Sequence, residues 1–385
     1  MVENKFSFAT ADTIIFGWGE RHTVSQYAAK FGSHGLLLHS RSVKEIPEIV
    51  ETLHRSGISV TQQVLTGEPT DEKVSTLADS YRDQQIDFII GVGGGSVLDT
   101  GKALSALVTN HGTLLDYLEV VGRGLPLQNP PCPYIALPTT AGTGTEVTKN
   151  AVIKVTSKNV KVSMRNAAMI PDIALIDPEL TVSLPPTITA STGMDAFIQV
   201  LEPYCSRNAN KMVDMFCREG IPLAAKTLPI VYHNPTDEKS RTMMAWVSLL
   251  GGLSLANAKL GAVHGFAGPI GGMFDVPHGV ICACLLPQVF KKNIVKVQEC
   301  GDENLVKRFN QIAAWVLGED NPSAPKAVEW FIALNEELSI PKLGQLGIKE
   351  PNFDAIIEKS LVSSSMKGNP VLLDAADLRE ILLNS

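Results

Sequence analysis

The first half of the chain alternates short apolar runs with segments that repeat apolar residues at helical spacing. Each apolar run has the length of a buried strand, and each intervening segment has the pattern of an amphipathic helix. The expected strands are residues 35–39, 60–65, 86–92, 134–137 and 173–176, with helices at 43–55, 71–82 and from about Val97. This alternation implies parallel strands joined by helical crossovers, and therefore an open α/β sheet.

The pattern changes after Leu184-Pro185-Pro186. From Ala190 onward the apolar residues follow long helical repeats, with few β-branched runs. We therefore predict two domains, an α/β dinucleotide-binding domain over residues 1–184 and an all-helical metal and substrate domain over residues 185–385. A length of 385 residues suits two such cores.

Composition and charge narrow the classes of partner. Apolar residues make up 44% of the chain and charged residues 19%, which is typical of a globular protein. The net charge of −7, without a long basic run, argues against nucleic acid and anionic membranes as partners. No apolar stretch approaches the roughly 18 residues that cross a bilayer, and the N-terminus lacks a signal pattern.

The six cysteines are scattered along the chain, and the close pair Cys282 and Cys284 lies in an apolar run typical of core packing. This usage predicts reduced thiols and a cytoplasmic protein.

A glycine-rich turn is the clearest motif. Gly93-Gly94-Gly95-Ser96 directly follows an apolar strand and opens a helix. Consecutive glycines permit close backbone approach and positive φ angles, and the helix N-terminus then faces an anion such as a pyrophosphate. Ser96 and Asp99 have the spacing of a capping box, which predicts the start of the helix. The spacing differs from G-x-G-x-x-G, and a tight turn without a ligand is the alternative interpretation.

A second loop of small residues, Pro138-Thr139-Thr140-Ala141-Gly142-Thr143-Gly144-Thr145-Glu146, follows the strand that ends at Leu137. Its hydroxyls and glycines suit the other side of the same cofactor. The two loops together predict a dinucleotide site.

The helical half carries a set of residues suited to a metal. Asp195 and Gln199 are four residues apart and share a helix face, while His264 and His278 lie in glycine-rich apolar surroundings. A carboxylate with two imidazoles suits a first-row divalent cation and leaves room for a substrate oxygen. The alternative is that each histidine is a core residue with its hydrogen bonds satisfied.

In these motifs the chain resembles the iron-containing (group III) alcohol dehydrogenases, which are related in fold to glycerol dehydrogenase and dehydroquinate synthase. The resemblance covers nearly the whole chain. The motifs that carry it are Phe16-Gly17-Trp18-Gly19, Gly93-Gly94-Gly95-Ser96 with Asp99, Thr140 to Thr148, Lys161, Pro171-Asp172, Asp177 to Thr181, Gly193-Met194-Asp195-Ala196 and Asp275-Val276-Pro277-His278-Gly279.

The resemblance implies a Rossmann-like α/β domain that holds NAD or NADP, an all-α domain that holds iron or zinc, and an active site in the cleft between them. It also implies homodimers or larger assemblies. The cofactor contacts that it implies are Gly94, Gly95, Ser96, Asp99, Thr139, Thr140, Thr143, Asn150, Lys161 and the stretch from Leu180 to Leu184. The implied metal positions are Asp195, Gln199, His264 and His278, of which Asp195, His264 and His278 are the expected catalytic residues.

Two residues depart from the family pattern. The family has histidine where this chain has Gln199, and a second histidine, with a proton-relay or nicotinamide-contact role, where it has Gly268. An amide oxygen suits Zn²⁺ or Fe²⁺ less well than imidazole does, so both a weakened metal site and loss of the metal stay open. Loss of the relay removes roughly 10²–10⁴ in rate if nothing compensates. The space at Gly268 suits a bulkier or charged substrate, so we expect a specialised aldehyde or alcohol.

The end of the first strand bears on cofactor choice. NAD-preferring relatives carry an aspartate near the position of Ser40, whereas this chain has Ser40-Arg41-Ser42. Arg41 and the serines suit a 2′-phosphate, which favours NADP(H), although an exposed arginine in a polar loop is the simpler interpretation.

The expected function is therefore NAD(P)-dependent alcohol dehydrogenase or aldehyde reductase, with hydride transfer between nicotinamide C4 and a carbonyl or alcohol carbon. Two alternatives stay open: a metal-independent reductase similar to the maleylacetate reductases, and a nucleotide-binding homologue with impaired catalysis. A lyase of the dehydroquinate-synthase type would need other metal ligands and a basic phosphate pocket.

Overall fold

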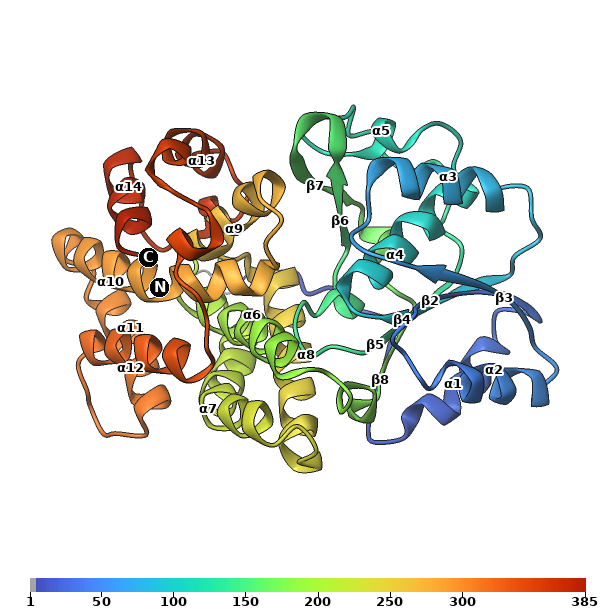
Figure 1. The fold of residues 1–385 in the computed structure, drawn as a ribbon, viewed down its shortest axis with the longest axis horizontal. Coiled ribbons are helices and arrows are strands. Elements are labelled where there is room, and N and C mark those ends of the chain that lie inside the picture. Colours follow the sequence, from blue (N-terminus) through green and yellow to red (C-terminus); the bar gives the residue numbers. More distant parts are fainter. Residues whose placement is uncertain (1–4) are drawn as a thin grey trace. The chain divides into compact units, whose positions relative to one another are not determined.

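The computed structural model describes residues 5–385, which fold into two compact units. The α/β unit comprises Thr10–Thr140 and Gly144–Ser183, and the helical unit comprises residues 5–9, Ala141–Thr143 and Leu184–Ser385. An α/β half followed by a helical half confirms the predicted fold class (Figure 1). The predicted boundary at residue 184 did not anticipate the two short segments that join the helical unit.

The α/β unit is built on a six-stranded parallel sheet of order β1-β8-β5-β4-β2-β3. Its strands are β1 (Thr13–Phe16), β2 (His34–Ser40), β3 (Ser59–Leu65), β4 (Phe88–Gly93), β5 (Tyr134–Pro138) and β8 (Ile173–Ile176). Its helices are α1 (Val24–Ala28), α2 (Ile46–Arg55), α3 (Asp71–Tyr81), α4 (Gly95–Thr109) and α5 (Leu114–Tyr117).

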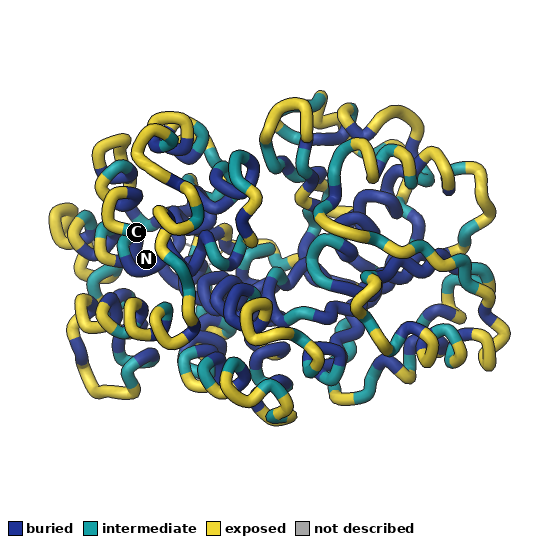
Figure 2. The backbone as a smooth tube through the Cα atoms, viewed as in Figure 1, coloured by how far each residue is buried: buried dark blue, intermediate teal, exposed yellow. Residues whose placement is uncertain are grey.

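Helices cover both faces of the sheet, as Figure 1 shows. Leu36 and Leu38 of β2 pack into a core with residues of α3 and α4, while Leu37 packs into a separate core with residues of α1 and α2. Successive side chains of a strand point to opposite faces, so burial on both faces explains the continuous apolar run. The strands accordingly form the buried interior in Figure 2.

An antiparallel pair, β6 (Asn150–Val155) and β7 (Val160–Arg165), lies outside the main sheet and was not predicted. Its residues alternate between buried and more exposed positions, with Ala151 and Ile153 fully buried and Val152 exposed. These strands contain no continuous apolar run, because buried residues alternate with lysines and other polar residues. Apolar runs along the sequence therefore do not predict them.

The helical unit is organised around α6 (Pro186–Cys205), whose residues are buried almost continuously from Thr189. The remaining long helices are α7 (Lys211–His233), α8 (Glu238–Ala258), α9 (Ala262–Met273), α10 (His278–Cys300), α11 (Glu303–Leu317), α12 (Ala324–Glu337), α13 (Phe353–Leu361) and α14 (Ala375–Asn384). Short 3₁₀ turns complete both units at Glu20–Thr23, Thr145–Val147, Thr156–Lys158, Ala167–Met169, Pro178–Thr181, Leu343–Leu346, Glu350–Asn352 and Met366–Gly368. Among residues 5–385 no single helix is long and apolar enough to cross a membrane, and α8 with α9 meets that requirement only as a pair bent by 98°.

The glycine turn after β4 corrects two predictions. Helix α4 begins at Gly95 with Gly94 as its N-cap, so Ser96 and Asp99 form no capping box. None of Gly93, Gly94 and Gly95 has a positive φ, and Gly94 is extended, with φ −76° and ψ −175°. These glycines instead provide space, because a Cβ on Gly93 would lie 2.6 Å from Val97.

Candidate metal centre and cofactor loops

The end of the sheet at which β2, β4 and β5 finish carries most of the predicted cofactor residues. The register pairs His39 with Val92 and Gly93 with Pro138, so the carboxyl ends of these strands lie at one edge. At this edge lie Ser40, which ends β2, with Arg41 after it, Gly94, Gly95 and Ser96 after β4, and Thr139 and Thr140 after β5. A helix N-terminus at this edge is the usual position for a dinucleotide phosphate.

Asp99 is turned into the protein rather than towards this edge. Its carboxylate accepts the Thr145 hydroxyl at 2.5 Å and the Val152 N–H at 2.9 Å, and it lies 3.3 Å from the fully buried Lys102 ammonium. Lys102 in turn donates to the carbonyl of Asn150. This network ties the second loop and β6 to α4 through Asp99, Lys102 and the backbone carbonyl of Asn150.

The other predicted cofactor residues are distributed over both units. Lys161 on β7 pairs with Glu68 at 2.5 Å, and Leu180 is buried in the 3₁₀ turn Pro178–Thr181. Thr143 and Leu184 belong to the helical unit. The predicted boundary at residue 184 had placed both in the α/β domain; each lies at a point where the chain passes from one unit to the other.

Three of the four predicted metal residues converge in the helical unit. Asp195 comes from the middle of α6, His264 from the first turn of α9, and His278 is the first residue of α10. His264 Nε2 lies 3.1 Å from Asp195 Oδ1, and His278 Nε2 lies 3.9 Å from the same oxygen. The Asp195 and His264 side chains are buried, whereas the His278 side chain keeps 39% of its surface exposed.

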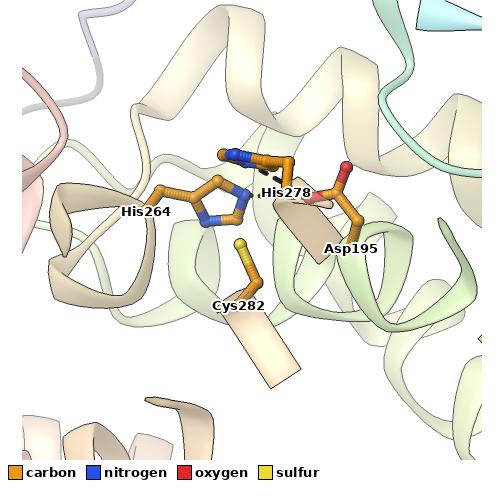
Figure 3. Close-up of side chains that lie close together, drawn as sticks. All are labelled: Asp195, His264, His278 and Cys282. Carbon is orange, nitrogen blue, oxygen red and sulfur yellow. Dashed lines mark hydrogen bonds and ion pairs between the residues drawn. The ribbon is translucent and has the colours of Figure 1, made fainter. Parts of the chain in front are cut away.

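Cys282 joins these three residues, and the sequence analysis missed it. One potential ligand atom from each of Asp195, His264, His278 and Cys282 lies within 4.8 Å of the others, and Figure 3 shows the four side chains turned towards a common point. Cys282 follows His278 by four residues, so both project from the same face of α10. That spacing was visible in the sequence, but the neighbouring Cys284 favoured the interpretation as core packing.

Gln199, the fourth predicted ligand, is buried one turn after Asp195 on α6. Its side chain is among the groups that lower the pKa of Asp195. Its Oε1 is buried without a hydrogen-bond partner among the described residues. The amide oxygen, the atom able to bind a metal, is therefore the one left without a partner.

Glu202 is a second residue that the sequence analysis missed. It lies two turns after Asp195 on α6, and its Oε2 is 2.7 Å from His264 Nδ1 while its Oε1 accepts the Val263 N–H at 2.7 Å. With Nδ1 bound to Glu202, Nε2 is the nitrogen that faces the cluster. A carboxylate behind the imidazole is the usual support of a metal-binding histidine.

The charges of the cluster are mutually dependent. Burial by itself would raise the pKa of Asp195, but the hydrogen bond from His264 and the charge of His278 outweigh it and lower that pKa. Burial disfavours protonated His264, yet Cys282, Asp195 and Glu202 together raise its pKa well above the ordinary range. Burial raises the pKa of a thiol, but His278 and His264 lower that of Cys282, whereas the pKa of Cys284 is raised to about 12 by burial.

The donor atoms fit a divalent cation. A carboxylate oxygen, two imidazole nitrogens and a sulfur are ligands of zinc and of related first-row metals, and a bound cation would replace the shared protons of the cluster. Three helices hold these donors in a site where all but His278 are buried, which is the arrangement expected of a metal centre in a helical domain.

Gly268, the position at which the resemblance led us to expect a second histidine, lies one turn after His264 on α9. No heavy atom of the described residues outside its own helix backbone and chain neighbours lies within 4 Å of the position that a Cβ would take there. The predicted space beside His264 is therefore present.

Comparisons with known proteins identify the family of the chain. Residues 11–178 match the family model of iron-containing alcohol dehydrogenases, and residues 189–385 match the model of the C-terminal part of that family. The 1,3-propanediol dehydrogenase of Citrobacter freundii is 32% identical, and the match covers 98% of this chain and 97% of that protein.

Solved structures lead to the same family. A crystal structure of 1,3-propanediol oxidoreductase matches with a TM-score of 0.89 and 31% identity over 98% of this chain and 99% of that one. Sulfoacetaldehyde reductase from Bifidobacterium kashiwanohense, solved in complex with NAD⁺, matches with a TM-score of 0.85 and 26% identity over 98% of each chain. The chain belongs to the iron-containing alcohol dehydrogenase family.

Proposed function

We propose that this protein is an NAD(P)-dependent alcohol dehydrogenase or aldehyde reductase that uses a divalent metal held in the helical unit. In the oxidative direction, the alcohol carbon gives a hydride to nicotinamide C4 and its hydroxyl gives up a proton, which leaves a carbonyl compound and the reduced cofactor. The single observation that carries the proposal is the convergence of Asp195, His264 and His278 in a protein of this family.

A bound metal would polarise the carbonyl oxygen and stabilise developing negative charge on it. The protein's own contribution is to hold the donors ready. Glu202 fixes the orientation of the His264 ring through Nδ1, so that Nε2 is the nitrogen available to the metal. Because Glu202 and His264 are buried, little reorganisation is needed when the site is loaded.

For the cofactor, the loop over Gly94, Gly95 and Ser96 provides N–H groups at the start of α4 for the pyrophosphate. We propose NADP(H) as the preferred form. Arg41 is exposed at the end of β2 and Ser40 Oγ lies 2.6 Å from Ser42 Oγ, so a cation and two hydroxyls are grouped where a ribose 2′-phosphate would bind.

For the substrate, the open space at Gly268 supports an aldehyde or alcohol with a bulky or charged substituent rather than a short unbranched one. A charged carbonyl substrate has a parallel in the sulfoacetaldehyde reductase to which this chain is similar. A homodimer or larger homo-oligomer and a cytoplasmic location complete the proposal, the latter supported by the six free cysteines.

A metal-independent reductase is the second candidate, and the replacement of a family ligand by Gln199 favours it. Against it stands the convergence of four potential ligand atoms within 4.8 Å of one another, which a divalent cation would occupy.

The test is turnover with both reduced cofactors across a panel of short, bulky and charged aldehydes. We expect NADPH oxidation with a member of the bulky or charged classes, and a loss of at least about 10²-fold in kcat for Asp195→Asn. Binding of the cofactor without turnover across the panel would contradict the proposal and favour a catalytically impaired homologue.

A further inference from the structure

We infer that Cys282, in place of Gln199, is the fourth protein ligand of the metal held by Asp195, His264 and His278. The inference rests on the metal site of the proposed function. It assigns a donor set of one carboxylate, two imidazoles and one thiolate. The thiolate comes from Cys282, for which the sequence alone suggested only core packing.

The position of Cys282 on α10 carries the first part of the argument. His278 is the first residue of this helix and Cys282 lies one turn later, so the helix presents both ligand atoms on one side. The sulfur and the donor atoms of the other three residues all lie within 4.8 Å of one another. Bonds of about 2.0–2.3 Å from one ion to four donors imply separations of roughly 3.3–3.8 Å between those donors, which small side-chain adjustments here provide.

Cys284 shows that this placement is specific to one of the two cysteines. Its thiol lies 2.7 Å from the Pro341 carbonyl, and Cys284 is not one of the four residues of the metal group. Two residues of helix turn the side chain by roughly 200°, so the C-x-C pair divides between the metal group and the core. Both cysteines are buried, which makes Cys284 a matched control.

Gln199 is poorly disposed to be the ligand. Its Oε1 is without a partner among the described residues, and that oxygen lies 3.7 Å from where a Cβ on Gly251 of α8 would be. A neutral amide oxygen also suits Zn²⁺ or Fe²⁺ less well than imidazole or thiolate does. The Cys282 sulfur already lies within 4.8 Å of the other three donor atoms.

The exchange of ligands also changes the charge and softness of the site. One carboxylate and one thiolate with two neutral imidazoles give a charge of −2, which balances a divalent cation. A thiolate favours Zn²⁺ or Co²⁺ over Mg²⁺ and Mn²⁺. Four protein ligands remain compatible with a substrate oxygen, because zinc also accepts a fifth ligand.

The experiment is cobalt substitution of the full-length protein, with absorption spectroscopy and metal analysis. We expect one Co²⁺ per chain, with a thiolate-to-cobalt charge-transfer band that Cys282→Ser removes and Cys284→Ser keeps. Cys282→Ser should also weaken Co²⁺ binding by about tenfold or more, whereas Gln199→Ala should retain the band and the stoichiometry. Circular dichroism of each variant tests folding.

The outcomes separate this inference from the proposed function. Stoichiometric cobalt without a thiolate band, or loss of cobalt in Gln199→Ala but not in Cys282→Ser, would overturn the assignment of Cys282 and leave the metal enzyme standing. Full NADPH-dependent turnover by a protein that binds no metal would overturn both the ligand and the metal dependence.

Discussion

Glu202 Oε2 lies 2.7 Å from His264 Nδ1, in the interior of the helical unit and behind the ring as seen from the metal group. The other oxygen of this carboxylate accepts the N–H of Val263, so the carboxylate is fixed by the same helix that carries the histidine. The pair determines which nitrogen of His264 is free to bind a metal.

Replacing Glu202 with Gln should weaken metal binding by about 10–100-fold, because a neutral amide supports the imidazole less strongly than a carboxylate does. Competition with a chromophoric chelator measures this affinity. Glu337→Gln is the matched control, since Glu337 also lies 3.0 Å from a histidine, His233, but both are exposed on the surface. Equal affinities for wild type and Glu202→Gln would contradict the role of this pair.

The open space at Gly268 predicts a change of substrate preference. A Gly268→Met side chain has room to project beside His264, and it should lower kcat/KM for bulky substrates by about tenfold while leaving short aldehydes less affected. Gly344→Met is the control, because that glycine also has no neighbour within 4 Å of its Cβ position but lies in the 3₁₀ turn Leu343–Leu346. A uniform loss across substrates would show that the space does not receive the substituent.

Arg41 should set the preference for the cofactor. Loss of a charge-assisted contact to a 2′-phosphate is worth about 1.5–3 kcal/mol, so Arg41→Ala should raise KM for NADPH by roughly 10- to 100-fold and leave KM for NADH unchanged. Arg55→Ala, at the far end of α2, removes another exposed arginine as a control. A parallel change in both KM values, or a wild-type preference for NADH, would rule out the proposed contact.

Glu146 predicts a pH dependence of stability in the α/β unit. Burial raises the pKa of its carboxyl from 4.5 to about 7, against the attraction of Lys102. Between these two values the folded state holds a proton that the unfolded state has lost. This group therefore makes stability fall as the pH rises from about 4.5 through about 7.

Glu146→Gln should remove this dependence, because the amide resembles the protonated carboxyl. The variant should gain about 2.5 kcal/mol relative to wild type on going from roughly pH 5 to pH 8, as measured by urea unfolding at each pH. Glu51→Gln, at an exposed position, should show no such gain. A constant difference between Glu146→Gln and wild type across this range would contradict the raised pKa.

Much of the fold followed from the apolar pattern because the parallel strands are buried on both faces. The predicted strand at residues 134–137 matches β5 (Tyr134–Pro138), and the one at 173–176 matches β8. The start of α4 was misplaced, because the Asp99 carboxylate binds Thr145 and Val152 instead of capping its own helix. The spacing of residues within the helix cannot predict a contact with residues so far along the chain.

The site was predictable where ligand spacing is local and unpredictable where it depends on packing. Asp195 and Gln199 were correctly placed on one face of a helix, but the direction of the Gln199 amide depends on its surroundings. Cys282 required the knowledge that His278 begins a helix, since only then do residues four apart share a face. The apolar sequence around Cys282, with a second cysteine two residues later, favoured core packing for both cysteines instead.

The most direct measurement is aldehyde-dependent NADPH oxidation by protein stripped of metal with a chelator and then titrated with Zn²⁺ or Fe²⁺. A metal-dependent alcohol dehydrogenase should lose activity on stripping and regain it at one equivalent of metal per chain, and Asp195→Asn should not regain it. Undiminished activity in the stripped protein would contradict the account and identify a metal-independent reductase.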